Sequence, residues 1–261
     1  MDAEVTVGGG GPAGLTAATF TAPAGLKTAV VSDGESILAR NAHLENMPAF
    51  PLGVNAPTFL ELCREGATEA GARLRDAPVT DTAATDGGFR IVTADGDAWM
   101  TRRLVAASWI DVSYLTDVDG LGLTARGSKT YVDVDEYGRT GVDGLYAAGR
   151  IAEKPHQPVV CAGHGAEVSL AVITDSDRPH YHDWVAPEGY FTGRGREVLP
   201  GCEEIAEPER RERERAAAER MRAAFADPAA APPTMHPSVE ATQDEEASDP
   251  IPDDDPDARN A

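Results

Sequence analysis

Three glycines near the start of the chain have the spacing of a phosphate-binding turn. Gly9, Gly11 and Gly14 complete the pattern G-x-G-x-x-G directly after an apolar run and directly before a helical pattern. The first glycine permits a tight turn, the second lets the backbone approach a pyrophosphate, and the third lets the helix pack closely on the strand. Pro12 and Ala13 then open a helix whose free N–H groups point at the phosphate charge. The chemistry expected here is dinucleotide binding.

The segment that follows supplies the second half of such a site. Residues 28–31 form a β-branched run that predicts a strand, and Asp33 follows Gly14 by 19 residues, where an acidic group accepts hydrogen bonds from a ribose. The order strand, glycine turn, helix, strand and acid therefore predicts a βαβ unit. In a chain with 26 glycines the pattern also arises by chance, and it does not separate FAD from NAD.

The charge of the chain limits its partners. The formal net charge of -21 excludes nucleic acid as a partner, because phosphate backbones need a basic surface. The 23 basic residues against 44 acidic ones, with arginine far more frequent than lysine, resemble the composition of proteins from salt-loving archaea. A dense carboxylate surface keeps such proteins soluble when salt screens their charges. The alternative is an acidic protein from a GC-rich genome.

Cysteine spacing and hydropathy indicate the compartment. Cys63, Cys161 and Cys202 include no C-x-x-C pair, so we expect neither a redox dithiol of that type nor a zinc knuckle. No apolar run reaches the ~20 residues that span a bilayer, and Met1 is followed by Asp2 rather than by a basic signal segment. We therefore expect a cytoplasmic protein with no membrane partner.

The remaining patterns predict an α/β fold. They indicate a helix over 57–74, a hairpin over 87–107 around Asp95-Gly96, strands at 131–134 and 145–148, and a helix over 158–174. The predicted architecture is a three-layer Rossmann-like domain at 1–175, with a parallel sheet and a β-hairpin crossover. Beyond it we expect an irregular segment packed on the domain at 176–206, a charged helix at 207–226 and a disordered acidic tail at 227–261.

Three separated stretches resemble one family. VGGGGPAGLTAA is similar to the first FAD motif of thioredoxin-reductase-like, FAD-dependent pyridine nucleotide-disulphide oxidoreductases. LENMPAFP resembles their I-E-N-Y-P-G-F loop, which lies against the flavin. TGVDGLYAAGR followed by HQPVVCAGHGAEVSLA resembles their second FAD motif and the helix after it. The resemblance covers residues 1 to about 175 and implies FAD as the cofactor.

The resemblance also implies which residues would hold the cofactor. The pyrophosphate would lie at the glycine turn, the flavin at the N–E–N–M loop and the second helix start, and the ribityl chain at the end of the last strand. The pyrophosphate residues would be Gly9, Gly11, Pro12, Ala13 and Gly14. The flavin residues would be Asn46, Gln157, Pro158, Ala162 and Gly163, and the ribityl residue would be Gly149. The ribose-binding acid of the family aligns with Ser32, which leaves Asp33 as a shifted candidate.

Besides the shift at Ser32, the chain departs from the family in four further places. A second G-x-G-x-x-G unit, which binds NADPH in the family, is missing, because only 35 residues lie between Trp109 and Leu145. The redox C-x-x-C is missing as well. The family's Gly-Asp becomes Gly149-Arg150, and Arg150 either pairs with the phosphate, which we favour, or marks a lost site. Trp109 replaces the glycine of an A-T-G turn, and we expect its ring to cap the surface that an NADPH domain would cover.

The candidate catalytic groups each have a plain structural alternative. The resemblance places Cys161 at a helix start near the flavin, where the helix dipole would lower the pKa of its thiol; the alternative is a small buried side chain. His156 and His164, with His43, lie in segments that should surround the flavin and could donate a proton, or they bond backbone and solvent. His180 and His182 lack further nearby ligands, so we expect no metal.

These observations lead to two functional expectations. The first is an FAD-binding oxidoreductase without a separate NADPH domain or redox dithiol, which exchanges electrons with a small-molecule or protein electron carrier. The second is a non-catalytic, FAD-dependent redox sensor or binding protein. A degenerate fold without a nucleotide is a third reading, which Arg150 makes conceivable. The resemblance also carries an expectation of a homodimer.

Overall fold

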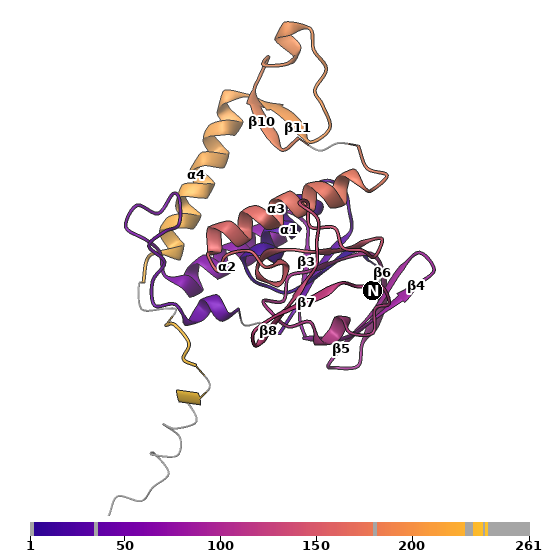
Figure 1. Cartoon of the computed structure of the whole chain (residues 1–261). Coiled ribbons are helices and arrows are strands. Elements are labelled where there is room, and N and C mark those ends of the chain that lie inside the picture. The colour runs from indigo at the N-terminus through magenta and orange to yellow at the C-terminus, as the bar shows by residue number, and fades with distance from the viewer. Residues whose placement is uncertain (1–2, 34–35, 180–181, 228–231, 237, 240–261) are drawn as a thin grey trace, which may run out of the picture.

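A branched seven-stranded sheet forms the centre of the computed structural model, which describes residues 3–33, 36–179, 182–227, 232–236 and 238–239 (Figure 1). Five strands run parallel in the order β3-β2-β1-β6-β9. Their bounds are β1 (Ala3–Gly8), β2 (Thr28–Ser32), β3 (Arg73–Asp76), β6 (Ala98–Ala106) and β9 (Leu145–Ala147). Every residue of β2 is buried, as its apolar, β-branched sequence requires for a strand covered on both faces.

The long strand β6 creates the branch. Its first half pairs antiparallel with β5 (Gly88–Thr93), which pairs with β4 (Val79–Thr85), and its second half pairs parallel with β1 and β9. The predicted hairpin around Asp95-Gly96 is confirmed. The strands β3 and β4 are not predicted from the sequence, because RLRD and VTDTAAT are polar, half-exposed edge segments without a clean apolar alternation.

Three helices lie on one side of the sheet: α1 (Pro12–Thr21), α2 (Ala56–Glu69) and α3 (Pro158–Thr174). Helices α1 and α3 touch backbone to backbone, because a Cβ at Gly165 would lie 2.2 Å from the Ala13 carbonyl oxygen. The predicted helix over 158–174 is confirmed. The helix predicted over 57–74 ends earlier, since the chain turns at Gly71, with φ 99°, and enters β3.

The opposite side of the sheet carries a small antiparallel hairpin and two short 3-10 helices. Strands β7 (Leu123–Arg126) and β8 (Lys129–Val132) pair antiparallel, and short 3-10 helices η2 (Ser113–Leu115) and η3 (Gly149–Ala152) flank them. Buried side chains such as Phe89, Trp99 and Leu104 fill the space between this layer and the sheet. The expected three-layer α/β architecture is therefore confirmed.

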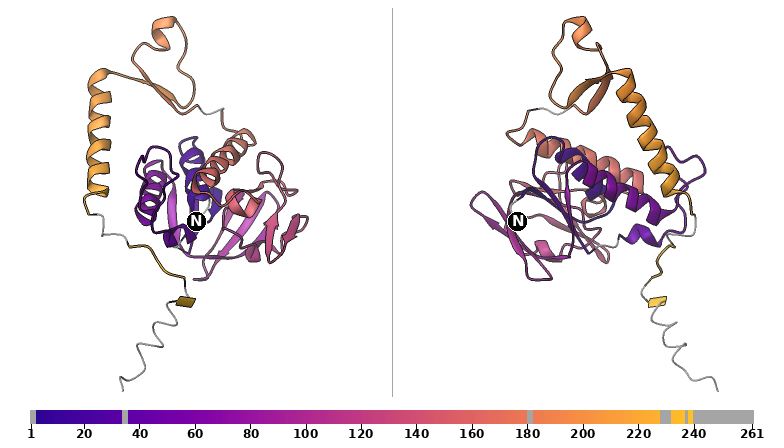
Figure 2. Two further views of the ribbon diagram at one scale, coloured as in Figure 1. Left: turned by 60° about the vertical axis from the view of Figure 1, so that its left-hand side comes forward. Right: turned by 180° about the vertical axis from the view of Figure 1, so that it is seen from behind.

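An arm extends from the body after α3 (Figure 2). It contains β10 (Trp184–Pro187) and β11 (Cys202–Ile205), paired in parallel, with η4 (Thr192–Arg194) between them, and α4 (Glu207–Ala224). The expectation of a wholly irregular segment at 176–206 was wrong, because two four-residue strands separated by a long loop give almost no local signal. None of the residues of α4 is buried, as its charge pattern predicts.

The far end of α4 returns to the body. Arg220 pairs with Glu65 of α2 at 2.5 Å, and Phe225 lies edge-on to Phe50 with ring centroids 6.2 Å apart. The expected tail at 227–261 falls mainly outside the described residues. No described helix is long and apolar enough to cross a membrane. A last 3-10 turn, η1 (Ile37–Arg40), follows β2 and completes the body.

Candidate functional site

A pocket opens at the carboxyl ends of the parallel strands, where open α/β sheets bind ligands. Its empty volume, including the open mouth, is about 980 Å³. The predicted site residues in its wall are Gly9, Gly11, Pro12, Ala13, Ser32, Asp33, Arg150, His156, Gln157, Pro158 and Cys161.

Two glycines of the turn are required by the fold itself. Gly9 has φ 131°, and a Cβ there would lie 2.4 Å from the Ala107 carbonyl oxygen. A Cβ at Gly14 would lie 2.1 Å from the Gly9 carbonyl oxygen. Side chains at these positions would push α1 away from the end of β1, so both glycines hold the helix start against the strand.

Gly11 is different, because the fold does not require a glycine there. Its φ of -85° and ψ of -178° are ordinary extended values, and among the described residues an added Cβ would meet Ser36 Oγ at 3.4 Å, a normal contact. It is the N-cap of α1, yet no side chain caps the helix there and the first turn carries no acidic residue. The first N–H groups of α1 are therefore available to a negatively charged ligand.

The end of β2 forms one side of the pocket. Ser32 is buried, and its Oγ would lie 2.7 Å from a Cβ at Gly10. Asp33 is exposed, and both Ser32 and Asp33 line the pocket. The end of β2 thus brings a hydroxyl and a carboxylate to the pocket wall.

The turn at Gly149 joins the first turns of two helices. Gly149 has a φ of 78°. A Cβ at this position would lie 2.7 Å from the Ala13 Cβ of α1 and 3.6 Å from the Cys161 Cβ of α3. The Gly149 N–H donates to His164 Nδ1 at 3.0 Å. The two helix starts and this turn therefore form one rigid corner of the site.

Arg150 leaves this corner toward the pocket. Its Nη1 donates to the Lys154 carbonyl at 3.0 Å, its Nη2 donates to the Tyr131 hydroxyl, and its guanidinium lies 4.9 Å from the centre of the Tyr131 ring. Its Nε is buried and has no partner among the described residues. The cation is thus held in place and keeps one unused donor.

Two contacts join segments far apart in sequence. Asn46 Nδ2 donates to Gln157 Oε1 at 2.5 Å, which ties the N-E-N-M loop to the start of α3. Trp109 lies edge-on to His156, with ring centroids 4.1 Å apart, and both rings line the pocket. Trp109 has φ 61°, a conformation that costs a bulky residue ~1–3 kcal/mol. Trp109 forms part of the pocket wall. From the sequence we expected its ring only to cap the surface that an NADPH domain would cover.

The three catalytic candidates differ in their surroundings. Cys161 lines the pocket and is buried, and burial raises the pKa of its thiol, so the expected lowering by the helix dipole was wrong. Burial and the charges of Arg150 and Lys129 lower the pKa of His156. His164 does not line the described pocket; burial lowers its pKa to about 4, and its Nε2 has no partner among the described residues.

Several predicted residues stand behind or beside the wall. Gly14 and Gly149 shape it through packing, Asn46 reaches it through Gln157, and Gly163 faces open space on α3. Ala162 is half-buried and does not appear in the wall. The described residues hold no cluster of three or more metal-ligating side chains, and His180 of the histidine pair lies outside them.

The sequence did not indicate another part of the wall. It comes from η1, from the turn between β3 and β4, and from the segment after β6: Ser36, Ile37, Leu38, Pro78, Val79, Ser108, Asp111 and Tyr114. These positions carry no motif, and only the crossing of three connections over the same strand ends brings them together.

No family model matches the chain. Over 135 residues it is 35% identical to a bifunctional thioredoxin reductase/thioredoxin of Mycobacterium leprae, a match that covers 51% of this chain and 29% of that protein. Over 107 residues it is 32% identical to a thioredoxin reductase of Aquifex aeolicus, a match that covers 40% of this chain and 33% of that protein. The matched segments span between 18% and 43% of the length of the curated relatives.

Solved structures agree on the architecture. A thioredoxin reductase from Gloeobacter violaceus superposes with a TM-score of 0.60 at 19% identity, covering 70% of this chain and 98% of that chain. The body has the thioredoxin-reductase fold. A thioredoxin reductase from Streptococcus pyogenes gives the same TM-score at 11% identity, covering 67% and 98%. The sequence matches add that the chain is homologous to thioredoxin reductases over about half of its length.

Proposed function

We propose that the chain is an FAD-binding flavoprotein oxidoreductase related to the thioredoxin reductases. Gly11 carries this proposal: it lies in the pocket wall at an uncapped helix start, and neither its backbone angles nor its neighbours require a glycine. A pyrophosphate lying against the first N–H groups of α1 would explain why position 11 is a glycine, because a side chain there would meet the ligand.

The residues present fit FAD. The glycine turn leaves room for a pyrophosphate, Ser32 or Asp33 would bind the adenosine ribose, and the unused Nε of Arg150 would donate to an acceptor of the cofactor. Gln157, held by Asn46, would lie along the flavin ring. FAD, when bound, supplies hydride and electron transfer, while the protein supplies position and electrostatics.

The chain's own groups then have distinct tasks. Helix α3 begins at the pocket with Pro158 and without a side-chain cap, so its positive end would stabilise negative charge there. Burial and two neighbouring cations favour the neutral form of His156, which can accept a proton and return it. The raised pKa of Cys161 keeps its thiol protonated, which suits packing better than redox chemistry.

The route of the electrons follows from residues 107–144, all of which the structure describes. They form η2 and the β7–β8 hairpin, with no second βαβ unit in that described stretch. Cys63, Cys161 and Cys202 are all free. We therefore infer that a small-molecule or protein electron carrier serves the flavin, with neither a second dinucleotide domain at this point of the chain nor a dithiol.

A redox sensor is the second candidate. The Thr234 N–H donates at 3.1 Å to the carbonyl of Ala39 in η1, and η1 also lines the pocket through Ile37 and Leu38. A change of the bound flavin could thus reach the segment that follows α4. This arrangement favours a protein that reports the state of its flavin to a partner.

A spectrum and a calorimetric titration test the proposal. Protein purified in molar salt should show flavin absorption bands, or the apoprotein should bind added FAD. Gly11→Ala should weaken FAD binding by about tenfold or more at unchanged Tm, because the new methyl group meets the ligand rather than the fold. Gly66→Ala, on an exposed face of α2 with open space around it, should bind FAD normally. Colourless wild-type protein that ignores FAD would refute the proposal.

Anaerobic mixing separates the enzyme from the sensor. Flavin-loaded protein is mixed with NADPH, NADH or reduced ferredoxin, and the loss of flavin absorbance is followed. Bleaching within seconds by one donor supports the oxidoreductase. If every donor leaves the flavin oxidised, the sensor becomes the better account.

A further inference from the structure

A group of cations lies beside the His156 end of the pocket. Lys129 begins β8, Lys154 follows η3, and Arg150 connects them through the bond of its Nη1 to the Lys154 carbonyl and its stacking on Tyr131 of β8. The chain contains three lysines in all and carries a net charge of -21. Two of its three lysines therefore stand in segments that Arg150 joins, on a protein that is acidic as a whole.

The electrostatic effects of these cations overlap. Lys129 and Arg150 both lower the pKa of His156, and Lys154 lowers the pKa of His164. Among the described residues, no carboxylate pairs with Lys129, Lys154 or Arg150. The neighbouring acid, Glu153, pairs instead with Arg126 at 3.1 Å. The positive charge is thus not neutralised locally.

Unpaired like charges in close proximity repel one another and do not stabilise a fold. Lys129, Lys154 and Arg150 are all half-buried residues. Helix α4 neutralises its arginines with glutamates of the same helix, as Arg210 does with Glu207 and Glu214. The cations beside the pocket lack such partners, which points to an anion supplied from outside the chain.

We propose that Lys129 and Lys154, beside the cofactor-binding Arg150, form a subsite for a small substrate that carries a carboxylate or phosphate group. This rests on the proposed flavin function, in which the subsite would hold the second substrate next to His156. The two lysines lie outside the pocket wall, while Arg150 and His156 are part of it. The pyrophosphate of FAD belongs at the start of α1, so the lysines remain free for another anion.

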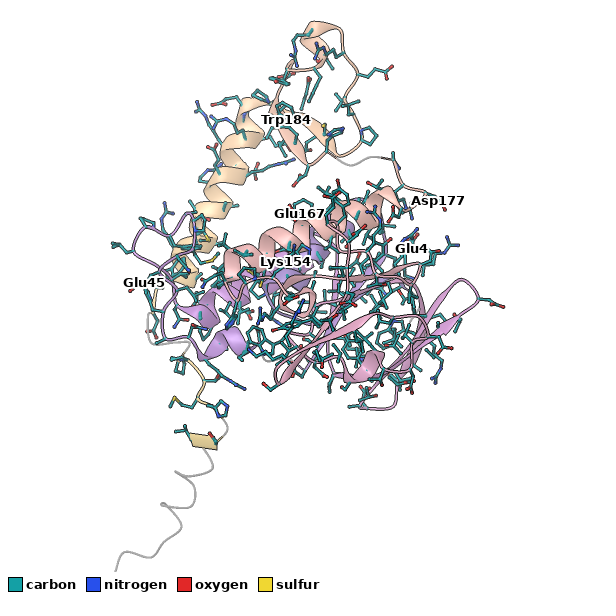
Figure 3. All side chains as sticks on the ribbon, viewed as in Figure 1. Glu4, Glu45, Lys154, Glu167, Asp177 and Trp184 are labelled. Carbon is teal, nitrogen blue, oxygen red and sulfur yellow. The ribbon has the colours of Figure 1, made fainter. Side chains whose placement is uncertain are left out.

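The burial of the cations favours a small anion over an acidic protein. A protein carrier needs a broad surface of charges that project outward. Here the charged groups are few and partly covered, and Arg150, which joins their segments, lines a concave site. Figure 3 shows Lys154 on the body below α3, well separated from Trp184 of the arm.

Anion binding to the flavin-loaded full chain tests the subsite. Inorganic phosphate is titrated at constant KCl concentration, and the flavin difference spectrum and binding heat are recorded. Wild type should bind, and Lys129→Gln with Lys154→Gln should raise the apparent Kd by about tenfold or more at unchanged FAD content. The matched control is Lys27→Gln, the third lysine, whose backbone N–H donates to the Glu4 carboxylate; Figure 3 shows Glu4 apart from Lys154. The control should behave as wild type.

Two results would overturn the proposal. The first is a flavin-loaded protein that binds no phosphate. The second is a double variant that binds phosphate as tightly as wild type. If that variant is also reduced more slowly by ferredoxin, the lysines serve an acidic protein carrier instead. A chain that fails to bind FAD refutes the proposed function instead, because FAD content is measured before any anion is added.

Discussion

At the residue scale, His164 shows how a buried imidazole can support a site without lining it. Its Nδ1 accepts the Gly149 N–H, so the ring must be neutral with its proton on Nε2. Burial lowers its pKa to about 4 from an ordinary value of 6.5. The ring therefore fixes the turn that leads to Arg150 only while it is unprotonated.

The pH dependence of stability should carry this signature. Since the folded pKa lies below the unfolded one, the contribution is complete above pH 6.5 and is lost as the pH falls toward 4. Between pH 7 and pH 5 the free energy of unfolding should fall by about 2 kcal/mol on this account. Denaturant unfolding of wild type and His164→Gln at both pH values measures it. An equal fall in both proteins would contradict the role assigned to His164.

At the element scale, the start of α1 is positioned by one close approach. Gly14 lies against the Gly9 carbonyl, and Val7 of β1 completes the contact. This packing leaves the helix N-terminus directed at the pocket, so the same contact supports both the fold and the ligand site. Helix α2, by contrast, carries Gly66 without any close neighbour.

Matched alanine substitutions should therefore have opposite effects. Gly14→Ala should lower the free energy of unfolding by about 1–3 kcal/mol or more, because a methyl group at 2.1 Å from a backbone oxygen forces α1 outward. Gly66→Ala should raise it by about 0.5–1 kcal/mol, since the helix loses a flexible residue and gains no clash. Urea unfolding measures both. A Gly14→Ala variant as stable as wild type would show that α1 can shift freely.

At the scale of the whole molecule, charge and the arm dominate. The net charge of -21 belongs to the whole chain, including its acidic C-terminal segment, and α4 adds several arginine–glutamate pairs that are worth little individually. The arm returns to the body through Arg220 and Phe225, near the loops that precede α2. We propose that the chain is adapted to concentrated salt, which screens its self-repulsion.

Stability should then rise with salt. Between ~0.1 M and ~1 M KCl the Debye length falls from about 10 Å to about 3 Å, which removes most repulsion between surface carboxylates. The Tm measured by circular dichroism should increase over this range. KCl is preferred to a sulfate salt, because sulfate strengthens apolar burial in any protein. A Tm that is constant or falls with KCl would contradict the proposed adaptation.

The amino-acid sequence determined the parts that rest on local patterns. The glycine turn, β1, α1, β2, the hairpin at β5–β6 and helix α3 all follow from apolar periods and glycine positions within short windows. The three family motifs added the fold class and the place of the site. Short-range patterns were sufficient because each of these elements is specified by residues that are close in sequence.

Only the tertiary structure decided the contacts across the site. Asn46 meets Gln157 over 111 residues of sequence, Trp109 meets His156, and Arg150 of η3 meets Tyr131 of β8. Burial also reversed the expected shift for Cys161, because desolvation outweighs the helix start there. Such outcomes depend on which segments the folded chain brings together and on how much water remains between them, and a linear pattern records neither.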